Sequence, residues 1–217
     1  LVMISTDKAV HPINMMGASK RFAEMVVLDE SSEAVGDFSI VRFGNVLGSR
    51  GSVVPIFKEQ IARGGPITIT HPEMKRYFMT IPEAVYLVLQ SATFSENGDI
   101  FILNMGEQIR ILDLAEDLIR LSGLEPGRDI ELVFTGIRQG DKLSEDLWDE
   151  GHSFKPTPHP DIFRLDPKSE LTGNDLDEVV AELSSLAKDG QSQKILQRIQ
   201  EILPDAQLII RTEENGK

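Results

Sequence analysis

Short apolar segments and amphipathic helical segments alternate along most of this chain, and this alternation limits the folds that it can adopt. Residues 1–5 (LVMIS) form an apolar run typical of a buried strand, and from Asn14 apolar residues recur with helical spacing. The same order then repeats, with strands expected at 37–48, 66–70, 100–106 and 130–136 and helices at 53–65, 81–93 and 111–123. Such alternation favours an α/β fold built on parallel strands.

The composition of the chain changes beyond residue 150. Residues 151–160 (GHSFKPTPHP) are rich in proline and are interpreted as an extended linker or surface loop. Two helical stretches follow at 173–190 and 191–205, and we expect them to form a small closing subdomain. The predicted division is therefore one region over 1–150 and a linker with a terminal helical segment over 151–217. Since the chain starts inside an apolar run without a methionine, it is interpreted as a piece of a longer protein.

Charge and composition exclude several classes of function. Acidic residues outnumber basic ones by 35 to 22, which gives a net charge of -13 and argues against a nucleic-acid partner. The chain has no cysteine, which fits a reducing, cytoplasmic compartment, and its 4 scattered histidines show no metal-ligand spacing, so no metal site is predicted. No apolar run approaches the roughly 20 residues that a membrane span needs, and no signal peptide is visible.

The segment STDKAVHPINMMGASK (5–20) places Met16 and Lys20 on one face of the expected helix. Many nicotinamide-dependent enzymes carry a tyrosine and a lysine at this spacing, but methionine cannot titrate. On spacing alone, the favoured interpretation is a strand followed by a helix whose methionines fill the core. Only the combination with other motifs favours a catalytic interpretation.

Four segments carry such a combination: STDKAVHPINMMGASKR (5–21), VRFGNVLGSRGSVVPIFKEQI (41–61), MKRYFMTIPEAVYLVL (74–89) and IRQGDKLSEDL (137–147). Together they resemble the carboxy-terminal part of an extended short-chain dehydrogenase/reductase, and they are most similar to the CapD-like nucleotide-sugar 4,6-dehydratases and epimerases. The resemblance covers roughly residues 1–150. It implies the C-terminal part of a Rossmann-like, doubly wound parallel sheet with a smaller mixed α/β substrate-binding subdomain. It also implies NAD or NADP, although the Gly-rich cofactor motif is absent from this chain and is expected upstream of Leu1.

The resemblance assigns catalytic roles to the first of these segments. Thr6 would hydrogen-bond the C4 oxygen of the sugar, Asp7 would protonate the departing C6 hydroxyl, and Lys8 would transfer the C5 proton. Lys20 would hold the nicotinamide ribose and supply positive charge. Met16 stands where the family usually has tyrosine, so the C4 base is either a carboxylate such as Asp7 or a water held by Thr6.

The second segment would contribute to substrate binding. The resemblance places Asn45 against the sugar or its diphosphate, and Ser52 and Val53 at a helix start that faces the nucleotide, where backbone N–H groups suit an anion. Residues 66–70 (PITIT), which include Ile67, would supply backbone hydrogen bonds to the uracil. Without the resemblance, the same glycine-rich segment could equally be a simple turn.

Two arginines complete the expected substrate site. Arg76 and Arg138 would clamp the diphosphate, for which a forked guanidinium is well shaped. Asp141 would reach the nucleotide ribose, less effectively than the glutamate more common at this position. Arg42 is ambiguous, because an arginine in a strand often only pairs with an acid.

The resemblance therefore implies a UDP-N-acetylglucosamine 4,6-dehydratase of polysaccharide or glycan synthesis, with this chain alone expected to be inactive. The alternatives are a UDP-sugar 4-epimerase, which needs no acid at C6, and a non-catalytic nucleotide-sugar-binding module. A homo-oligomer is expected. The methionine-bearing branch of the family carries amino-terminal membrane helices, so the longer protein is expected at the inner membrane, facing the cytoplasm, with no membrane contact through the present residues.

Overall fold

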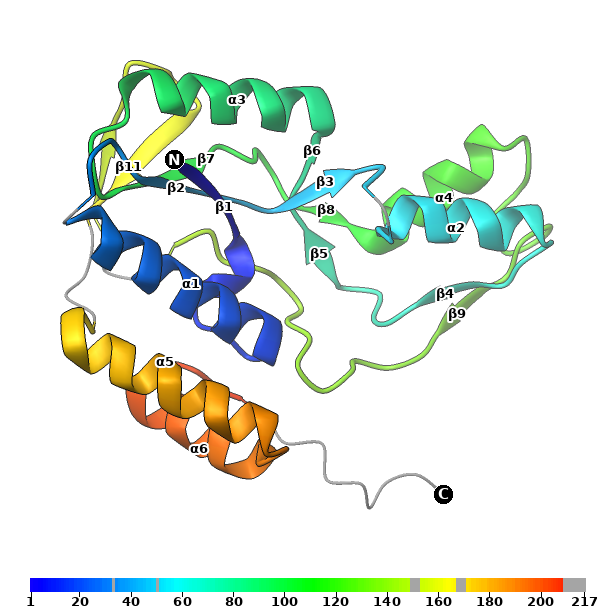
Figure 1. The fold of residues 1–217 in the computed structure, drawn as a ribbon. Coiled ribbons are helices and arrows are strands. Elements are labelled where there is room, and N and C mark those ends of the chain that lie inside the picture. The colour runs from blue at the N-terminus through cyan, green and yellow to red at the C-terminus, as the bar shows by residue number, and fades with distance from the viewer. Residues whose placement is uncertain (33, 50, 149–152, 167–170, 209–217) are drawn as a thin grey trace. The chain divides into compact units, whose positions relative to one another are not determined.

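The chain forms two compact units, each built from separate stretches of sequence (Figure 1). The computed structural model describes residues 1–32, 34–49, 51–148, 153–166 and 171–208. The first unit comprises Leu1–Phe43, Val88–Leu103 and Asp146–Lys217, and the second comprises Gly44–Leu87 and Asn104–Glu145. The chain therefore passes from one unit to the other several times.

A five-stranded sheet organises the first unit, in the order β1-β2-β7-β11-β10. The strands β1 (Val2–Thr6), β2 (Ser39–Phe43) and β7 (Asp99–Leu103) are parallel, whereas β11 (Ile162–Leu165) runs antiparallel to β7 and β10 (Phe154–Pro156) antiparallel to β11. The central strands are buried on both faces, as expected for parallel strands between helices. The predicted α/β class with a parallel sheet is confirmed.

Helices cover both faces of this sheet. Helix α1 (Met15–Ser31) lies on one face, and the final turns of α3 (Ile81–Phe94) lie on the other (Figure 1). Helix α1 begins as expected at Asn14, whose side chain accepts a hydrogen bond from the Gly17 amide at 2.9 Å. Within the described residues, no helix is both long and apolar enough to cross a membrane.

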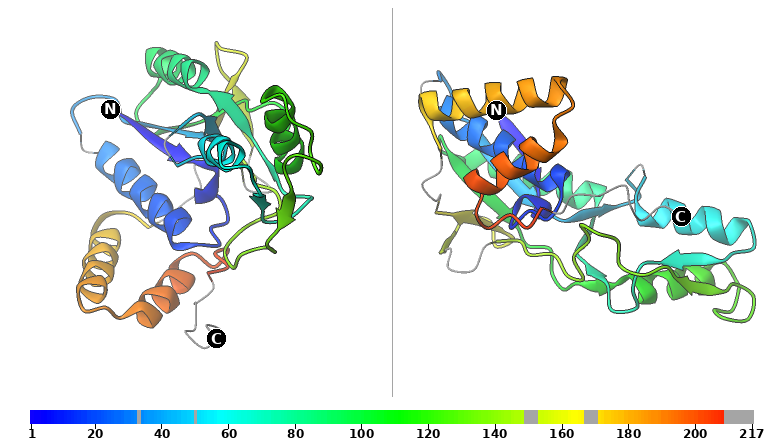
Figure 2. Two further views of the ribbon diagram at one scale, coloured as in Figure 1. Left: turned by 90° about the vertical axis from the view of Figure 1, so that its right-hand side faces the viewer. Right: turned by 90° about the horizontal axis from the view of Figure 1, so that it is seen from below.

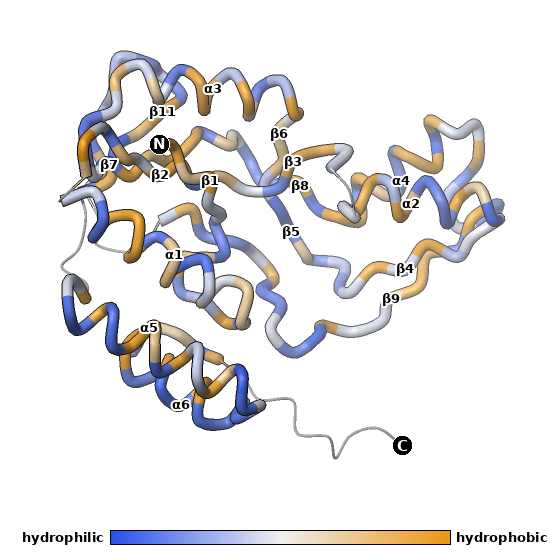
Figure 3. Tube along the Cα trace, viewed as in Figure 1, coloured by the Kyte–Doolittle hydropathy of each residue, from blue (hydrophilic) through white to orange (hydrophobic). Residues whose placement is uncertain are grey.

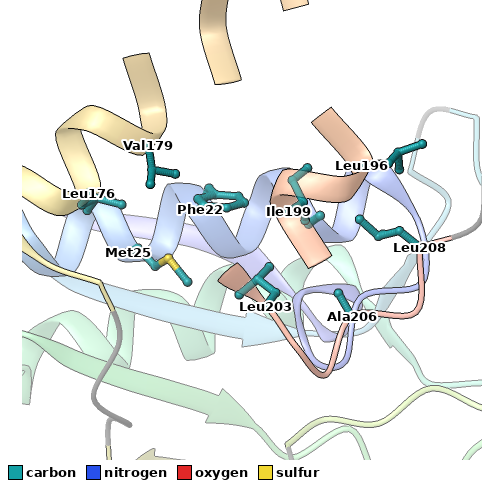
Figure 4. Packing of buried hydrophobic residues seen from close by; sticks show 10 residues of the cluster. Phe22, Met25, Leu176, Val179, Leu196, Ile199, Leu203, Ala206 and Leu208 are labelled. Carbon is teal, nitrogen blue, oxygen red and sulfur yellow. The ribbon is translucent and has the colours of Figure 1, made fainter. Parts of the chain in front are cut away.

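The terminal helices α5 (Gly173–Lys188) and α6 (Ser192–Ile202) pack against α1 (Figure 2). Their hydrophobic residues recur between hydrophilic ones along each helix (Figure 3), and the apolar side chains meet Phe22 and Met25 of α1 (Figure 4). The buried contributors from this end of the chain are Leu176, Val179, Leu196, Ile199, Leu203, Ala206 and Leu208. The terminal segment is thus part of the core of the first unit.

The second unit contains short strand pairs and two helices. Strand β3 (Asn45–Leu47) pairs with β6 (Phe78–Thr80), β4 (Ile67–Ile69) with β9 (Leu132–Phe134), and β5 (Lys75–Arg76) with β8 (Ile109–Arg110). Helices α2 (Val53–Ala62) and α4 (Ile111–Leu121) pack on β4 around a core that includes Phe57 and Ile119. This unit has the mixed α/β architecture expected of the smaller subdomain.

The segment expected to be a linker contains regular structure. Residues 153–166 include the hairpin β10–β11, in which Thr157 Oγ1 donates to the Ile162 carbonyl at 2.7 Å. Pro156 is accommodated because β10 is an edge strand, where a missing N–H costs no ladder hydrogen bond on the open side. The expected start of the linker, at 151–152, lies outside the described residues. The predicted domain boundary near residue 150 stays a prediction.

Candidate active site

The carboxyl end of β1 carries three polar residues in one tight turn. Thr6 caps the short 3-10 helix η1 (Asp7–Ala9), and its Oγ1 donates to Asp7 Oδ1 at 2.8 Å. Lys8 Nζ reaches the same oxygen at 2.9 Å. Three of the five residues predicted from the sequence to be catalytic therefore contact one another.

Asp7 is the most buried of the three, with no exposed side-chain surface. Its Oδ1 receives the hydrogen bonds from Thr6 and Lys8, whereas Oδ2 is buried and has no hydrogen-bond partner within the described part of the chain. A buried polar atom without a partner is costly, because it loses its hydration without compensation. The turn therefore holds a buried acceptor without a partner beside a hydroxyl and an ammonium group.

Helix α1 brings Lys20 to the same strand. Its Nζ donates to the carbonyl of Ile4 in β1 at 3.3 Å. The helix approaches the turn closely, since a Cβ on Gly17 would lie 2.1 Å from the Lys8 carbonyl oxygen. Met16 is 48% exposed in the first turn of α1, so it does not fill the core as the purely structural interpretation expected.

This constellation can bind and move protons at a small polar ligand. The Thr6 hydroxyl can donate or accept, the Asp7 carboxyl can accept or pass on a proton, and the Lys8 ammonium can donate. Groups of this kind act as general acids and bases when a substrate comes within hydrogen-bond reach. Tyrosine, the usual partner of the lysine on the helix, is replaced by the non-titrating Met16.

The predicted substrate-binding residues lie in the second unit. Arg76 is largely buried, and its Nη1 donates to the carbonyls of Lys75 at 2.7 Å and Leu143 at 3.3 Å. Its Nη2 lies 3.6 Å from Oε1 of the buried Glu145. Arg138 is exposed on the loop that follows β9. Its carbonyl accepts a hydrogen bond from the amide of the half-buried Asp141.

The remaining predicted residues lie at β3, α2 and β4. Asn45 begins β3, and its side chain donates to the Tyr77 carbonyl at 3.2 Å. Ser52 is the N-cap of α2 before Val53, and its buried Oγ has no hydrogen-bond partner among the described residues. Ile67 is fully buried in the core of the unit, with its amide donating to the Glu131 carbonyl at 2.9 Å.

Two buried carboxylates near these residues were not predicted from the sequence. Glu145 accompanies Arg76, and Glu24 pairs with the ambiguous Arg42. Glu24 follows Lys20 by one helical turn and has apolar neighbours that are buried. This position was the only sequence feature that could have indicated a buried carboxylate. Glu145 gave no signal, because its partner is distant in sequence.

Comparisons with known proteins show the family of the chain. The profile of the polysaccharide biosynthesis protein family matches residues 1–167. The capsular polysaccharide biosynthesis protein CapD of Staphylococcus aureus is 55% identical over 165 residues, which are 75% of this chain and 27% of that protein. The UDP-glucose 4-epimerase of Rickettsia bellii is 34% identical over 81% of this chain and 50% of its own length.

Solved structures share the fold. Pen from Bacillus thuringiensis superposes with a TM-score of 0.67 at 32% identity, over 80% of this chain and 53% of the other. Nucleotide-sugar dehydratases and epimerases, some with bound NAD, share the fold at lower identity. The chain spans about a quarter of the length of CapD and about half of the solved chains. By its sequence and its fold, the chain belongs to the polysaccharide biosynthesis protein family, as a CapD-like member of the extended short-chain dehydrogenases/reductases.

Proposed function

We propose that this chain provides the proton-transfer and substrate-binding part of a nucleotide-sugar 4,6-dehydratase that acts on UDP-N-acetylglucosamine. The observation that carries the proposal is the buried Asp7 carboxyl, which is bound by Thr6 and Lys8 at one oxygen and has no hydrogen-bond partner among the described residues at the other. An elimination of water needs an acid at the departing hydroxyl, and a buried carboxyl with an open oxygen suits that role. Membership of a polysaccharide biosynthesis family supports the substrate class.

Each of the three residues has a defined task in this reaction. The Thr6 hydroxyl binds the C4 oxygen and orients the ring. The Asp7 carboxyl gives its proton to the C6 hydroxyl as water leaves, and Lys8 exchanges the C5 proton. The proton at the C4 hydroxyl leaves either to Asp7 or through a water held by Thr6, because Met16 cannot accept it.

The cofactor of this reaction is NAD or NADP, which when bound takes a hydride from C4 and returns it to C6. Lys20 fits the ribose end of such a cofactor, since its ammonium is partly exposed and held at the β1 backbone. The sequence contains no G-x-G-x-x-G turn for the pyrophosphate. The residues present thus fit only the nicotinamide end.

The second unit would hold the UDP portion. Arg138 is exposed and can pair with the diphosphate, and Arg76, whose guanidinium also contacts Glu145, would bind the same group. The open Ser52 hydroxyl and the first amides of α2 from Val53 suit a phosphate oxygen. Asn45 would bind the sugar, Asp141 the ribose, and the β4 backbone at Ile67 the uracil.

A 4-epimerase is the second candidate, favoured by the identity with the Rickettsia enzyme. Epimerisation needs redox chemistry at C4 only. It leaves the buried acid at Asp7 without a task, so the dehydratase explains more of the site.

The test is incubation of the protein encoded by the complete gene with UDP-N-acetylglucosamine and NAD in deuterated water, followed by proton NMR. A dehydratase gives a methyl signal from a 4-keto-6-deoxy sugar, with deuterium at C5. Formation of the C4 epimer without a methyl signal would identify an epimerase. Binding of the nucleotide sugar without any product would support the non-catalytic module.

A further inference from the structure

A fully buried ion pair lies behind the candidate site, within the first unit. Both oxygens of Glu24 are occupied: Oε1 accepts from Arg42 Nε at 2.8 Å and from Ser5 Oγ at 2.6 Å, and Oε2 accepts from Arg42 Nη2 at 2.6 Å. Glu24 and Arg42 are each only 1% exposed. Arg21 Nη1 approaches Oε2 at 3.5 Å from the same helix.

The pair connects the three elements that carry or flank the site. Ser5 directly precedes Thr6 in β1 and is the register partner of Arg42 in β2. Glu24 lies on α1 one turn after Lys20, so the two side chains share a face of the helix. The Glu24 carboxylate therefore connects the end of β1, which leads into the turn of Thr6, Asp7 and Lys8, to the helix that carries Lys20.

Stability alone does not account for this arrangement. Replacing a buried ion pair by apolar side chains of similar volume is often neutral or even stabilising, because the desolvation of both charges is avoided. A bidentate pair differs from apolar packing because it fixes the relative orientation of the two side chains. Two parallel hydrogen bonds allow little rotation of either partner. The rotation of α1 about its axis determines where the Lys20 ammonium lies.

We propose that Glu24 and Arg42 are positioning residues that fix the rotation of α1 and hold the Lys20 ammonium at the Ile4 carbonyl of β1. The proposal rests on the proposed function for the role of Lys20. Displacement of a reacting or charged group by about 1 Å can cost roughly 100-fold in rate. The pair thus acts through Lys20 and touches no substrate.

The test compares two multiple variants of the protein encoded by the complete gene. Ser5→Ala/Glu24→Leu/Arg42→Met replaces the pair and its hydroxyl partner by apolar side chains. Asp99→Asn/Arg164→Met is the matched control, because it removes a partly buried ion pair, with Nη2 and Oδ2 at 3.1 Å, from the opposite end of the same sheet. Melting temperature, KM for the nucleotide sugar and kcat are measured for each.

The proposal predicts that the apolar variant keeps its melting temperature and KM while kcat falls at least tenfold, and that the control keeps kcat. A folded apolar variant with kcat within twofold of the unchanged protein would overturn it. If the apolar variant does not fold, Glu24→Asp, which shortens the side chain but keeps both charges, is judged by the same criterion.

Failure of the proposed function gives a different result, namely no 4-keto-6-deoxy sugar from the unchanged protein. Crystal structures of that protein and of the apolar variant then decide the positioning role. Displacement of Lys20 Nζ from the Ile4 carbonyl in the variant alone supports the proposal. A hydrogen bond kept in both structures contradicts it.

Discussion

Asp7 and Gly17 are the residues that shape the candidate site most directly. Asp7 supplies the open carboxyl oxygen, and Gly17 lets the backbone of the turn reach the first turn of α1. Gly17 has an ordinary helical backbone conformation. It is important because its Cα lies next to the Lys8 backbone carbonyl, which cannot rotate away as a flexible side chain could. A small change at either position therefore acts on the whole turn.

Substitution of Gly17 by alanine tests this close approach. The added Cβ would lie 2.1 Å from the Lys8 carbonyl oxygen, so the turn and the helix must move apart. We expect Gly17→Ala to lower the free energy of unfolding by about 3 kcal/mol, at the upper end of the range for overpacking. Urea denaturation measures this loss, and the control Ser19→Ala on the exposed face of α1 should change it by less than about 0.5 kcal/mol. Equal stability of the two variants would contradict the account.

At the scale of single elements, α3 shows how local sequence determines a helix start. Thr80 Oγ1 accepts from the Glu83 amide at 3.4 Å, and Glu83 Oε2 accepts from the Thr80 amide at 2.7 Å. This reciprocal pair is a capping box. We expect Thr80→Ala to cost about 1 kcal/mol in urea denaturation, while Thr93→Ala near the other end of the helix serves as the control. A Thr80→Ala variant as stable as that control would show that the cap contributes nothing.

The same cap predicts a pH dependence. The pKa of Glu83 is lowered below its usual value by hydrogen bonds from the Thr80 hydroxyl and then the Thr80 amide. A carboxyl with a lowered folded-state pKa stabilises the fold above its unfolded-state pKa of about 4.3, and the effect is lost as pH falls through the folded-state value. Glu83→Gln should therefore be less stable than the unchanged chain at pH 7, with the difference vanishing in acid. A difference that stays constant down to acidic pH would contradict this explanation.

Elements with a strong local pattern were predictable from the sequence, whereas those that depend on distant partners were not. The apolar run of β1 and the Asn14 cap of α1 are local signals, and both elements form as predicted. The hairpin β10–β11 was missed because prolines at 156, 158 and 160 are typical of a loop, and because its strands are defined by the pairing of β11 with β10 and with β7. In the candidate site, the contact of Thr6, Asp7 and Lys8 was predictable because they are adjacent. The pairing of Glu24 with Arg42 needed the tertiary structure.

At the scale of the whole molecule, the sheet unit contains Thr6, Asp7 and Lys8, the residues proposed to transfer protons, and the smaller unit contains the residues expected to bind UDP. Residues 171–208, beyond the family match, belong to the core of the first unit. The expected homo-oligomer and the expected position of the longer protein at the inner membrane stay predictions.

Titration calorimetry on this chain alone tests whether its residues bind the nucleotide sugar but not the cofactor. We expect UDP and UDP-N-acetylglucosamine to bind, since the chain contains the residues predicted to contact the diphosphate and the uracil, Arg76, Arg138 and Ile67. We expect no heat from NAD, because the chain contains no Gly-rich turn for the pyrophosphate. Binding of NAD at an affinity similar to UDP would show that the assignment of residues to substrate and cofactor is wrong.

Asp7 is proposed to give a proton to the C6 hydroxyl. The most direct test is proton NMR of the product formed in deuterated water by the protein encoded by the complete gene, with Asp7→Asn. Asparagine keeps the size of the side chain but cannot give a proton to the C6 hydroxyl. The account predicts that the methyl signal of the 4-keto-6-deoxy sugar falls at least 100-fold, the upper range for loss of a general acid being about 10⁴-fold, while Asp117→Asn on the exposed face of α4 has no effect. Formation of that product by Asp7→Asn at the unchanged rate would contradict it.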